Sequence, residues 1–204
     1  MAPPCSGSTA GLNQAGDARD RQQIAQFLTG DRSAFDALIG HHKARVYNLV
    51  CHMVGDPEWA QDVTTEALLQ IYRSLGRFRG ECTFRTWLYR VTLNVCRHEL
   101  RARGRRRIPE RPLVEDMAGE DLPFEKLAAT VLVSKVRETL ALLPEKQRAA
   151  VILFFLEELT YREMAAILQV PINTVKARVF QGIRSLRNRL RDTLDLGTVE
   201  GNTL

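Results

Sequence analysis

The sequence predicts an all-α protein made of two small helical domains joined by a linker, the second of which contains a helix-turn-helix. Apolar residues recur at helical spacing along nearly the whole chain, and no strand-like alternation persists. A charged, proline-containing stretch interrupts that periodicity after Gly104. At 204 residues, the chain is long for one small domain and comfortable for two.

The breaks in the apolar stripes set the expected domain bounds. Gly55, Asp56 and Pro57 mark the end of one helix and the capped start of the next. Thr83 is placed to cap a helix that begins at Phe84. We expect a flexible tail, a first domain, a linker, a second domain and a C-terminal tail over residues 1–20, 21–103, 104–123, 124–192 and 193–204. In the second domain we expect helices over residues 124–143, 145–157, 161–168 and 172–192.

Composition argues against a membrane or secreted protein. Hydrophobic residues make up 45% of the chain, which is enough for packed cores. No segment approaches the roughly 20 apolar residues of a membrane span. The N-terminal residues lack the apolar run of a signal peptide. We therefore expect a cytoplasmic protein without membrane insertion.

Positive charge is concentrated in two separate segments. Residues 97–112 contain seven arginines and two acids, and residues 176–192 contain six basic residues and one acid. Between them, residues 113–125 contain five acids and no basic residue. This pattern indicates two contacts with a polyanion, although ordinary solvated helix faces explain the charge alone equally well.

The segment from Leu159 to Arg187 has the features of a helix-turn-helix. Thr160 and Glu163 fit a capping box, and Pro171 disfavours a helical conformation at the residue before it. A short helix, a tight turn and a longer basic helix form the arrangement that places a recognition helix in the major groove of DNA. The alternative is an ordinary helical hairpin with a basic outer face.

The second helix of this segment separates into an apolar and a polar face. The apolar stripe, which should face the core, contains Val175, Val179, Ile183, Leu186 and Leu190. On the other face, Phe180 can meet thymine methyl groups, Lys176 can reach guanine acceptors and Gln181 can pair with adenine. Asn173, Thr174 and Arg178 are placed to hold phosphates. The full set of candidate duplex-binding residues is Tyr161, Arg162, Asn173, Thr174, Lys176, Ala177, Arg178, Phe180, Gln181 and Arg184.

The predicted helix from Phe84 to Arg107 combines three aromatic residues with eight arginines. Its apolar stripe consists of Phe84, Trp87, Leu88, Val91 and Val95. The residues largely off this stripe are Arg85, Tyr89, Asn94, Arg97 and Arg101. Aromatic rings and a planar amide beside arginines suit unstacked bases and a phosphate backbone. We predict a helix that is both core and nucleic-acid surface, and a membrane-surface helix is the alternative.

Nothing in the sequence indicates catalysis, and no cofactor is expected. The four cysteines (Cys5, Cys51, Cys82 and Cys96) form no CxxC pair and are expected to be free thiols. A metal cluster of His41, His42, Cys51 and His52 is an alternative, but its spacing matches no familiar ligand pattern. No nucleophile, metal site or phosphate-binding loop suggests an enzyme.

Two long segments resemble a known family. Residues 55–75 (GDPEWAQDVTTEALLQIYRSL) followed by residues 77–94 (RFRGECTFRTWLYRVTLN) are similar to region 2 of the bacterial extracytoplasmic-function sigma factors. Residues 143–178 (LPEKQRAAVILFFLEELTYREMAAILQVPINTVKAR) resemble region 4 of the same group. The resemblance covers residues 22–103 and 127–191, in the expected order.

The resemblance implies that the protein directs RNA polymerase core enzyme to specific promoters and aids promoter opening, in a stress or envelope response controlled by an anti-sigma factor. Region 2 would dock on the β′ clamp helices through Asp62, Thr65 and Glu66. Region 4 would hold the β flap and read the −35 element as duplex through the candidate duplex-binding residues. The expected partners are core polymerase, promoter DNA and an anti-sigma factor.

The resemblance also implies that region 2 binds the −10 element. The loop of residues 76–83 would shape a pocket for a flipped base, and Asn94 would read the upstream edge of the element. The candidate −10 residues are Phe78, Arg79, Arg85, Trp87, Arg90, Asn94, Arg97 and Arg101. In this chain His98 replaces a polar Asp or Asn, and Gln169 replaces the usual turn glycine, which predicts slight strain in the turn.

Two other functions fit parts of the sequence. A two-component-type regulator with this helix-turn-helix would need no domain like region 2. A helical adaptor that binds only protein would not need Phe180 exposed beside Lys176.

Overall fold

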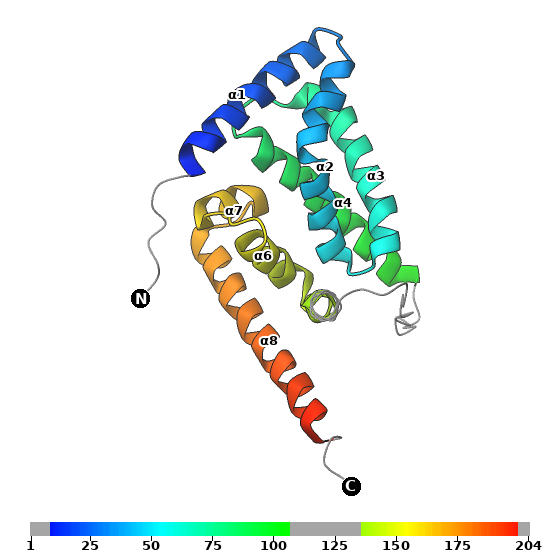
Figure 1. The fold of residues 1–204 in the computed structure, drawn as a ribbon, viewed down its shortest axis with the longest axis vertical. Helices are drawn as coiled ribbons and strands as arrows, with labels where there is room; N and C mark the ends of the chain where they lie inside the picture. Colours follow the sequence, from blue (N-terminus) through cyan, green and yellow to red (C-terminus); the bar gives the residue numbers. More distant parts are fainter. Residues whose placement is uncertain (1–8, 107–135, 200–204) are drawn as a thin grey trace, which may run out of the picture.

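The computed structural model describes residues 9–106 and 136–199, with side chains over residues 16–104 and 136–191. This part of the chain contains helices and no strand, so the all-α prediction is confirmed. The elements in chain order are α1 (Thr9–Leu28), α2 (Ser33–Val54), α3 (Pro57–Ser74), the 3-10 turn η1 (Leu75–Arg77), α4 (Phe84–Arg106), α6 (Glu145–Phe155), α7 (Tyr161–Leu168) and α8 (Ile172–Val199) (Figure 1). Residues 136–141 are also helical.

The first domain is a bundle in which α2, α3 and α4 lie side by side and α1 packs on α2 (Figure 1). Its fully buried side chains include Leu38, Leu49, Met53, Ile71 and Leu88. Burying this apolar surface is the main stabilising contribution to such a bundle.

The N-terminal helix differs from the sequence prediction. Since α1 begins at Thr9, the prediction of a flexible tail over residues 1–20 is wrong for residues 9–20, and residues 1–8 lie outside the described part. Both carboxylate oxygens of Asp20 lie 3.1 Å from Nε2 of His42, and both side chains are buried. Because a buried polar group needs a partner, this pair ties α1 to α2.

The predicted helix boundaries of the first domain are confirmed at the caps. Gly55 has φ 82°, the left-handed conformation that ends α2, and Pro57 is the first residue of α3. The Asp56 side chain accepts a hydrogen bond from the backbone N–H of Trp59 at 3.1 Å. The Thr83 hydroxyl accepts one from the backbone N–H of Thr86 at 3.2 Å.

The second domain consists of residues 136–141 with α6, α7 and α8. The two longer helices cross so closely that a Cβ on Gly182 would lie 2.5 Å from Cγ2 of Val151. Four members of the predicted stripe of α8 face the core, with Val175 and Val179 buried and Ile183 and Leu186 packed at its edge. The fifth, Leu190, is half-buried and is not packed against this core.

Two predicted helices of the second domain are found with small shifts at their ends. Helix α7 spans the predicted residues, and α6 ends two residues early, a usual uncertainty for helix ends. Helix α8 runs to Val199, so the prediction of a tail over residues 193–204 is wrong for residues 193–199. Residues 104–106 close α4. The rest of the predicted linker, and residues 124–135 of the predicted helix 124–143, lie outside the described residues.

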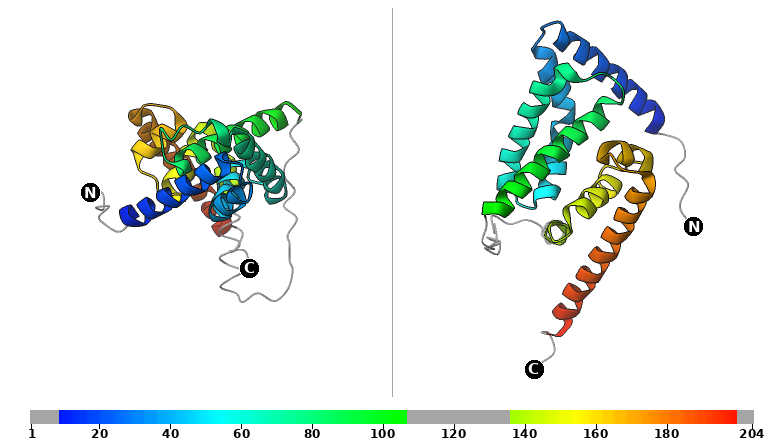
Figure 2. Two further views of the ribbon diagram at one scale, coloured as in Figure 1. Left: turned by 90° about the horizontal axis from the view of Figure 1, so that it is seen from above. Right: turned by 180° about the vertical axis from the view of Figure 1, so that it is seen from behind.

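The two domains touch directly. Helix α7 packs against α4, and α6 packs against α2. The views from the front and from behind show the second domain alongside the first (Figures 1 and 2).

Candidate nucleic-acid interface

Helix α7 has a defined start and a defined end, and its end leads into the turn before α8. The Glu163 carboxylate accepts a hydrogen bond from the Thr160 backbone N–H at 2.8 Å, and the Thr160 hydroxyl accepts one from the Glu163 N–H at 3.3 Å. This confirms the predicted capping box. At the other end, Gln169 has φ 54° and ψ 46°, the left-handed conformation in which a side chain is strained. Gln169 therefore occupies a position that favours glycine.

The polar face of α8 is open to solvent. Phe180 exposes 69% of its surface although it is a large aromatic residue. Exposed side chains surround it, namely Asn173, Lys176, Ala177, Gln181 and Arg184, while Thr174 and Arg178 are half-buried. The predicted duplex-binding residues of α8 thus lie together on one accessible face.

The two predicted duplex-binding residues of α7 lie at its first turn. Tyr161 is half-buried and stacks on Phe154, with 5.2 Å between ring centroids. The ammonium of Lys176 lies 5.8 Å from the centroid of the Tyr161 ring, a cation–π contact that joins α7 to α8. Arg162 is exposed beside it.

An aromatic cluster anchors the loop before α4. Phe78 lies 6.0 Å from Phe84 and 5.5 Å from Trp87 between ring centroids, and both of its partners belong to the first turn of α4. Phe78 and Trp87 are half-buried, and Arg79 is exposed. The loop is therefore held against the end of α4.

The predicted −10 residues of α4 divide into two groups. Asn94 and Arg101 are exposed, as predicted for residues that contact DNA. Arg85, Arg90 and Arg97 are half-buried and bind the second domain instead of standing free. The backbone oxygen of Glu157 accepts a bond from Arg85 at 2.8 Å, and that of Ala166 accepts one from Arg90 at 2.8 Å.

The prediction that Tyr89 lies on the nucleic-acid face is wrong. Helical spacing placed it with the nucleic-acid face, but the residue is completely buried. Its hydroxyl donates a hydrogen bond to the Glu157 carboxylate of the second domain. Burial, reinforced by the charge of Glu157, raises the pKa of Tyr89 well above its usual range. Burial likewise raises the pKa of Glu157, although its bond from Tyr89 and the nearby Arg85 oppose that effect.

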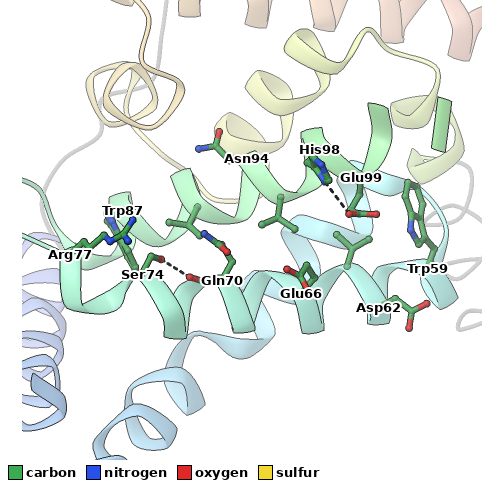
Figure 3. A pocket seen from close by; sticks show the side chains of 13 residues that line it. Trp59, Asp62, Glu66, Gln70, Ser74, Arg77, Trp87, Asn94, His98 and Glu99 are labelled. Atoms are coloured by element: carbon green, nitrogen blue, oxygen red, sulfur yellow. Dashed lines mark hydrogen bonds and ion pairs between the residues drawn. The ribbon is translucent and has the colours of Figure 1, made fainter. Parts of the chain in front are cut away.

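A groove of about 880 Å³ runs between α3 and α4 (Figure 3). The wall from α3 includes Asp62 and Glu66, and the wall from α4 includes Asn94 and His98. Trp87 lies at one end of the groove and Trp59 at the other (Figure 3). The groove brings two of the predicted polymerase-binding residues and a predicted base-reading residue to one depression, which helical spacing within single segments does not reveal.

The remaining predicted polymerase-binding residue is outside the groove lining. Thr65 is exposed on α3, and its hydroxyl donates a hydrogen bond to the backbone oxygen of Gln61 at 3.0 Å. Asp62 and Glu66 are also exposed, so all three side chains are accessible from solvent.

Two of the three histidines of the possible metal cluster have other partners. His42 binds Asp20, and Nδ1 of His52 lies 2.7 Å from the backbone oxygen of Asn48. Within the described side chains, no three His, Cys, Asp or Glu residues gather where they could hold a metal ion. Of the four cysteines, Cys51, Cys82 and Cys96 are described and are free thiols. No helix in the described part is long and apolar enough to cross a membrane.

Together, the capped α7, the turn after it and the exposed basic face of α8 give the second domain the form of a helix-turn-helix. The first domain carries a basic helix of its own, α4. A known protein family matches each of the two domains. The sigma-70 region 2 family matches residues 38–106, and the sigma-70 region 4 family matches residues 134–186.

Curated relatives extend this match along most of the chain. The RNA polymerase sigma-H factor of Pseudomonas aeruginosa is 33% identical over 190 residues, which cover 86% of this chain and 96% of the relative. The ECF RNA polymerase sigma-E factor of Haemophilus influenzae is 32% identical over 181 residues, covering 84% and 95%. The chain therefore belongs to the sigma-70 family, in its extracytoplasmic-function (ECF) group. It is a sigma factor, which directs RNA polymerase core enzyme to specific promoters at transcription initiation.

Solved structures show the same fold. A structure of CnrH in complex with the cytosolic domain of CnrY has a TM-score of 0.66 at 22% identity, covering 85% of this chain and 98% of that one. The sigma factor RpoE of Bartonella quintana, solved with the anti-sigma factor NepR, has a TM-score of 0.60 at 20% identity, covering 77% and 96%.

Proposed function

We propose that three elements of this sigma factor divide the work of initiation. The helix α3 docks on the β′ clamp helices through Asp62, Thr65 and Glu66. The helix α4 and the loop before it bind the −10 element, and the helix-turn-helix reads the −35 element while the second domain holds the β flap. The exposure of Phe180 beside the exposed Lys176 and Gln181 is the observation that carries the assignment of α8, because an apolar ring among a cation and an amide matches the methyl groups and acceptors of the major groove.

Promoter opening follows from where binding energy is released. The second domain anchors on duplex DNA, and the first traps bases that have left the stack. Flipping a base costs a few kcal/mol, and contacts in the binding pocket offset that cost. On this account, strand opening by the protein is driven by binding energy rather than by ATP.

We further propose that an anti-sigma factor controls this protein and that it acts in the cytoplasm, where it meets polymerase. The RpoE protein of Bartonella quintana, which shares this fold, was solved with such a factor. The large exposed apolar residues Phe155 and Leu156 give the second domain a surface that a protein partner can cover.

The polymerase contact is tested by reversing charge on α3. Asp62→Lys/Glu66→Lys should abolish retention on core RNA polymerase, because both carboxylates are exposed where the clamp helices would lie. Glu58→Lys is the control, since Glu58 is also exposed on α3 but does not line the groove. The readout is pull-down of the full-length protein with core enzyme, followed by transcription in vitro. Normal retention of the double variant would overturn the assignment of α3.

A further inference from the structure

The second domain presents negative groups to the arginines of α4. The Glu157 backbone oxygen, which binds Arg85, follows the end of α6. The Ala166 backbone oxygen, which binds Arg90, is one of the last four carbonyls of α7. Carbonyls at helix C-termini carry the negative end of the helix dipole. They are therefore suited to take the place of phosphate oxygens on a guanidinium.

Two side-chain contacts extend this contact along α4. The Tyr89 hydroxyl binds the Glu157 carboxylate, and Nε of Arg97 lies 3.1 Å from Glu145 at the start of α6. The contacts run from Arg85 to Arg97, a distance of about 18 Å along a helix axis. They leave three of the predicted −10 arginines, Arg85, Arg90 and Arg97, half-buried.

A buried arginine fixes the same interface from the other side. Arg148 is only 8% exposed, and its guanidinium donates to the backbone oxygens of Met53 at the end of α2 and of Ala141 and Leu143 in the second domain. A buried charge is tolerated only when its hydrogen bonds are made. The arrangement of the two domains therefore has a specific polar anchor besides the contacts of α4.

The other proposed surfaces remain open in the same arrangement. Asp62 and Glu66 on α3 are exposed, and so are Lys176 and Phe180 on α8. Closure thus engages Arg85, Arg90 and Arg97 of the proposed −10 face and leaves the second nucleic-acid face and the proposed polymerase dock accessible.

We propose that the second domain acts as an intramolecular lid on the −10 face of the first domain, with Glu157, Glu145 and the Ala166 carbonyl holding the arginines that would otherwise bind single-stranded DNA. The identity of the covered face rests on the proposed function of α4. In the free protein Arg85, Arg90 and Arg97 are held away from −10 DNA, while Asn94 and Arg101 stay exposed and the protein can still meet polymerase and −35 duplex. Binding to single strands then requires the lid to open, which lowers the apparent affinity by the fraction of open molecules.

The test compares two neighbouring charge reversals in the full-length chain. Glu157→Lys places a cation against Arg85 and removes the acceptor of Tyr89. Glu158→Lys makes the same change of charge at an exposed residue that takes no part in the described contacts with α4. Two readouts are used: the radius of gyration from X-ray scattering, and the affinity for a fluorescent single-stranded oligonucleotide library with six randomised positions.

We expect Glu157→Lys to increase the radius of gyration and to strengthen single-strand binding about fivefold or more, as the open fraction rises. Glu158→Lys should leave the radius unchanged and strengthen binding only through its added charge. Equal behaviour of the two variants in both readouts would overturn the lid. A larger radius without any single-strand binding in either variant would support the lid but reject α4 as the −10 face. If Glu157→Lys loses helicity, Glu145→Lys, which breaks the Arg97 contact, decides by the same two readouts.

Discussion

The sequence predicts nucleic-acid contacts for two basic helices, α8 and α4, and in the structure these helices differ in how far their basic faces are exposed to solvent. The outer face of α8 is free, with Phe180 at 69% exposure, whereas α4 is covered on two sides. One side of α4 packs in the core of its own domain, and part of the other binds the second domain through Arg85 and Arg90. The comparison teaches that a basic, exposed pattern in a sequence does not distinguish a DNA face from a face held by another part of the same chain.

The largest effect should come from the core side of α4. Leu88 is completely buried, so Leu88→Ala should lower the free energy of unfolding by about 2–5 kcal/mol through lost burial and a cavity. Thermal or urea unfolding measures this loss. The matched change on the outer side, Asn94→Ala, should leave stability nearly unchanged because Asn94 is exposed. Equal losses in the two variants would mean that α4 has no separate outer face.

The next effect concerns base reading by that outer face. If Asn94 reads a base, Asn94→Ala should remove about 1–3 kcal/mol of discrimination at one −10 position and little elsewhere. Arg101→Ala, at an exposed residue proposed to contact phosphate, should weaken binding evenly across sequences and reduce its dependence on salt. A panel of single-stranded −10 variants at fixed salt separates the two patterns. A uniform loss for Asn94→Ala would make it a backbone contact instead.

The free helix of the comparison allows the same kind of test. Lys176→Ala should weaken binding of −35 duplex by about 1–3 kcal/mol if the ammonium reaches a guanine. Because Lys176 is exposed on α8 and takes no part in the contacts between α4 and the second domain described above, single-strand binding by the full-length protein should not change. Electrophoretic mobility shifts with duplex and single-stranded libraries give both values. A parallel fall in both affinities would show that the two faces are not independent.

A smaller effect is expected at the turn that positions α8. Gln169 is left-handed at φ 54°, so Gln169→Gly should relieve strain and stabilise the protein by about 1 kcal/mol or less. The control is Arg162→Gly, an exposed position within α7, which should destabilise by about 0.5–1 kcal/mol because glycine is unfavourable in a helix. Changes of opposite sign in the free energy of unfolding of the two variants, measured by thermal unfolding, would confirm the strain. Two changes of the same sign would mean that the loss of the Gln169 side chain outweighs the backbone term.

Local signals explain how much of the fold was predictable. The caps at Asp56 and Thr160 and the apolar stripe of α8 are read from residues within one or two turns, and the structure reproduces them. The contacts of Tyr89 and Arg148 join residues 68 and 95 positions apart, and no local spacing records such pairs. For that reason the exposure of Asn94 and Arg101 on the proposed −10 face was predictable from helical spacing, and the coverage of Arg85 and Arg90 by the second domain was not. The helix over residues 9–20 was missed because its polar composition shows no apolar stripe, although Asp20 is buried against His42.

The smallest expected effect is a pH dependence at the lid. Burial raises the pKa of Glu157 above its usual value when the domains are closed, where Tyr89, Arg85, Arg45 and His52 surround it. A group with a raised folded-state pKa contributes stability that is fully present below its unfolded pKa and is lost as pH rises through the folded pKa. At pH 7 the ionised carboxylate therefore opposes folding slightly, and Glu157→Gln, which resembles the protonated form, should be a little more stable than the natural protein. The difference should shrink as pH falls toward the usual glutamate value of about 4.3, because the natural side chain then becomes neutral as well.

Urea unfolding of both proteins at pH 7 and pH 5 measures this difference in the free energy of unfolding. The same measurement on Glu158→Gln gives the effect of removing a charge from an exposed position, which is then subtracted. A difference that grows as pH falls would mean that the bonds from Tyr89 and Arg85 outweigh the burial of Glu157, so that the lid holds an ionised rather than a neutral carboxyl group.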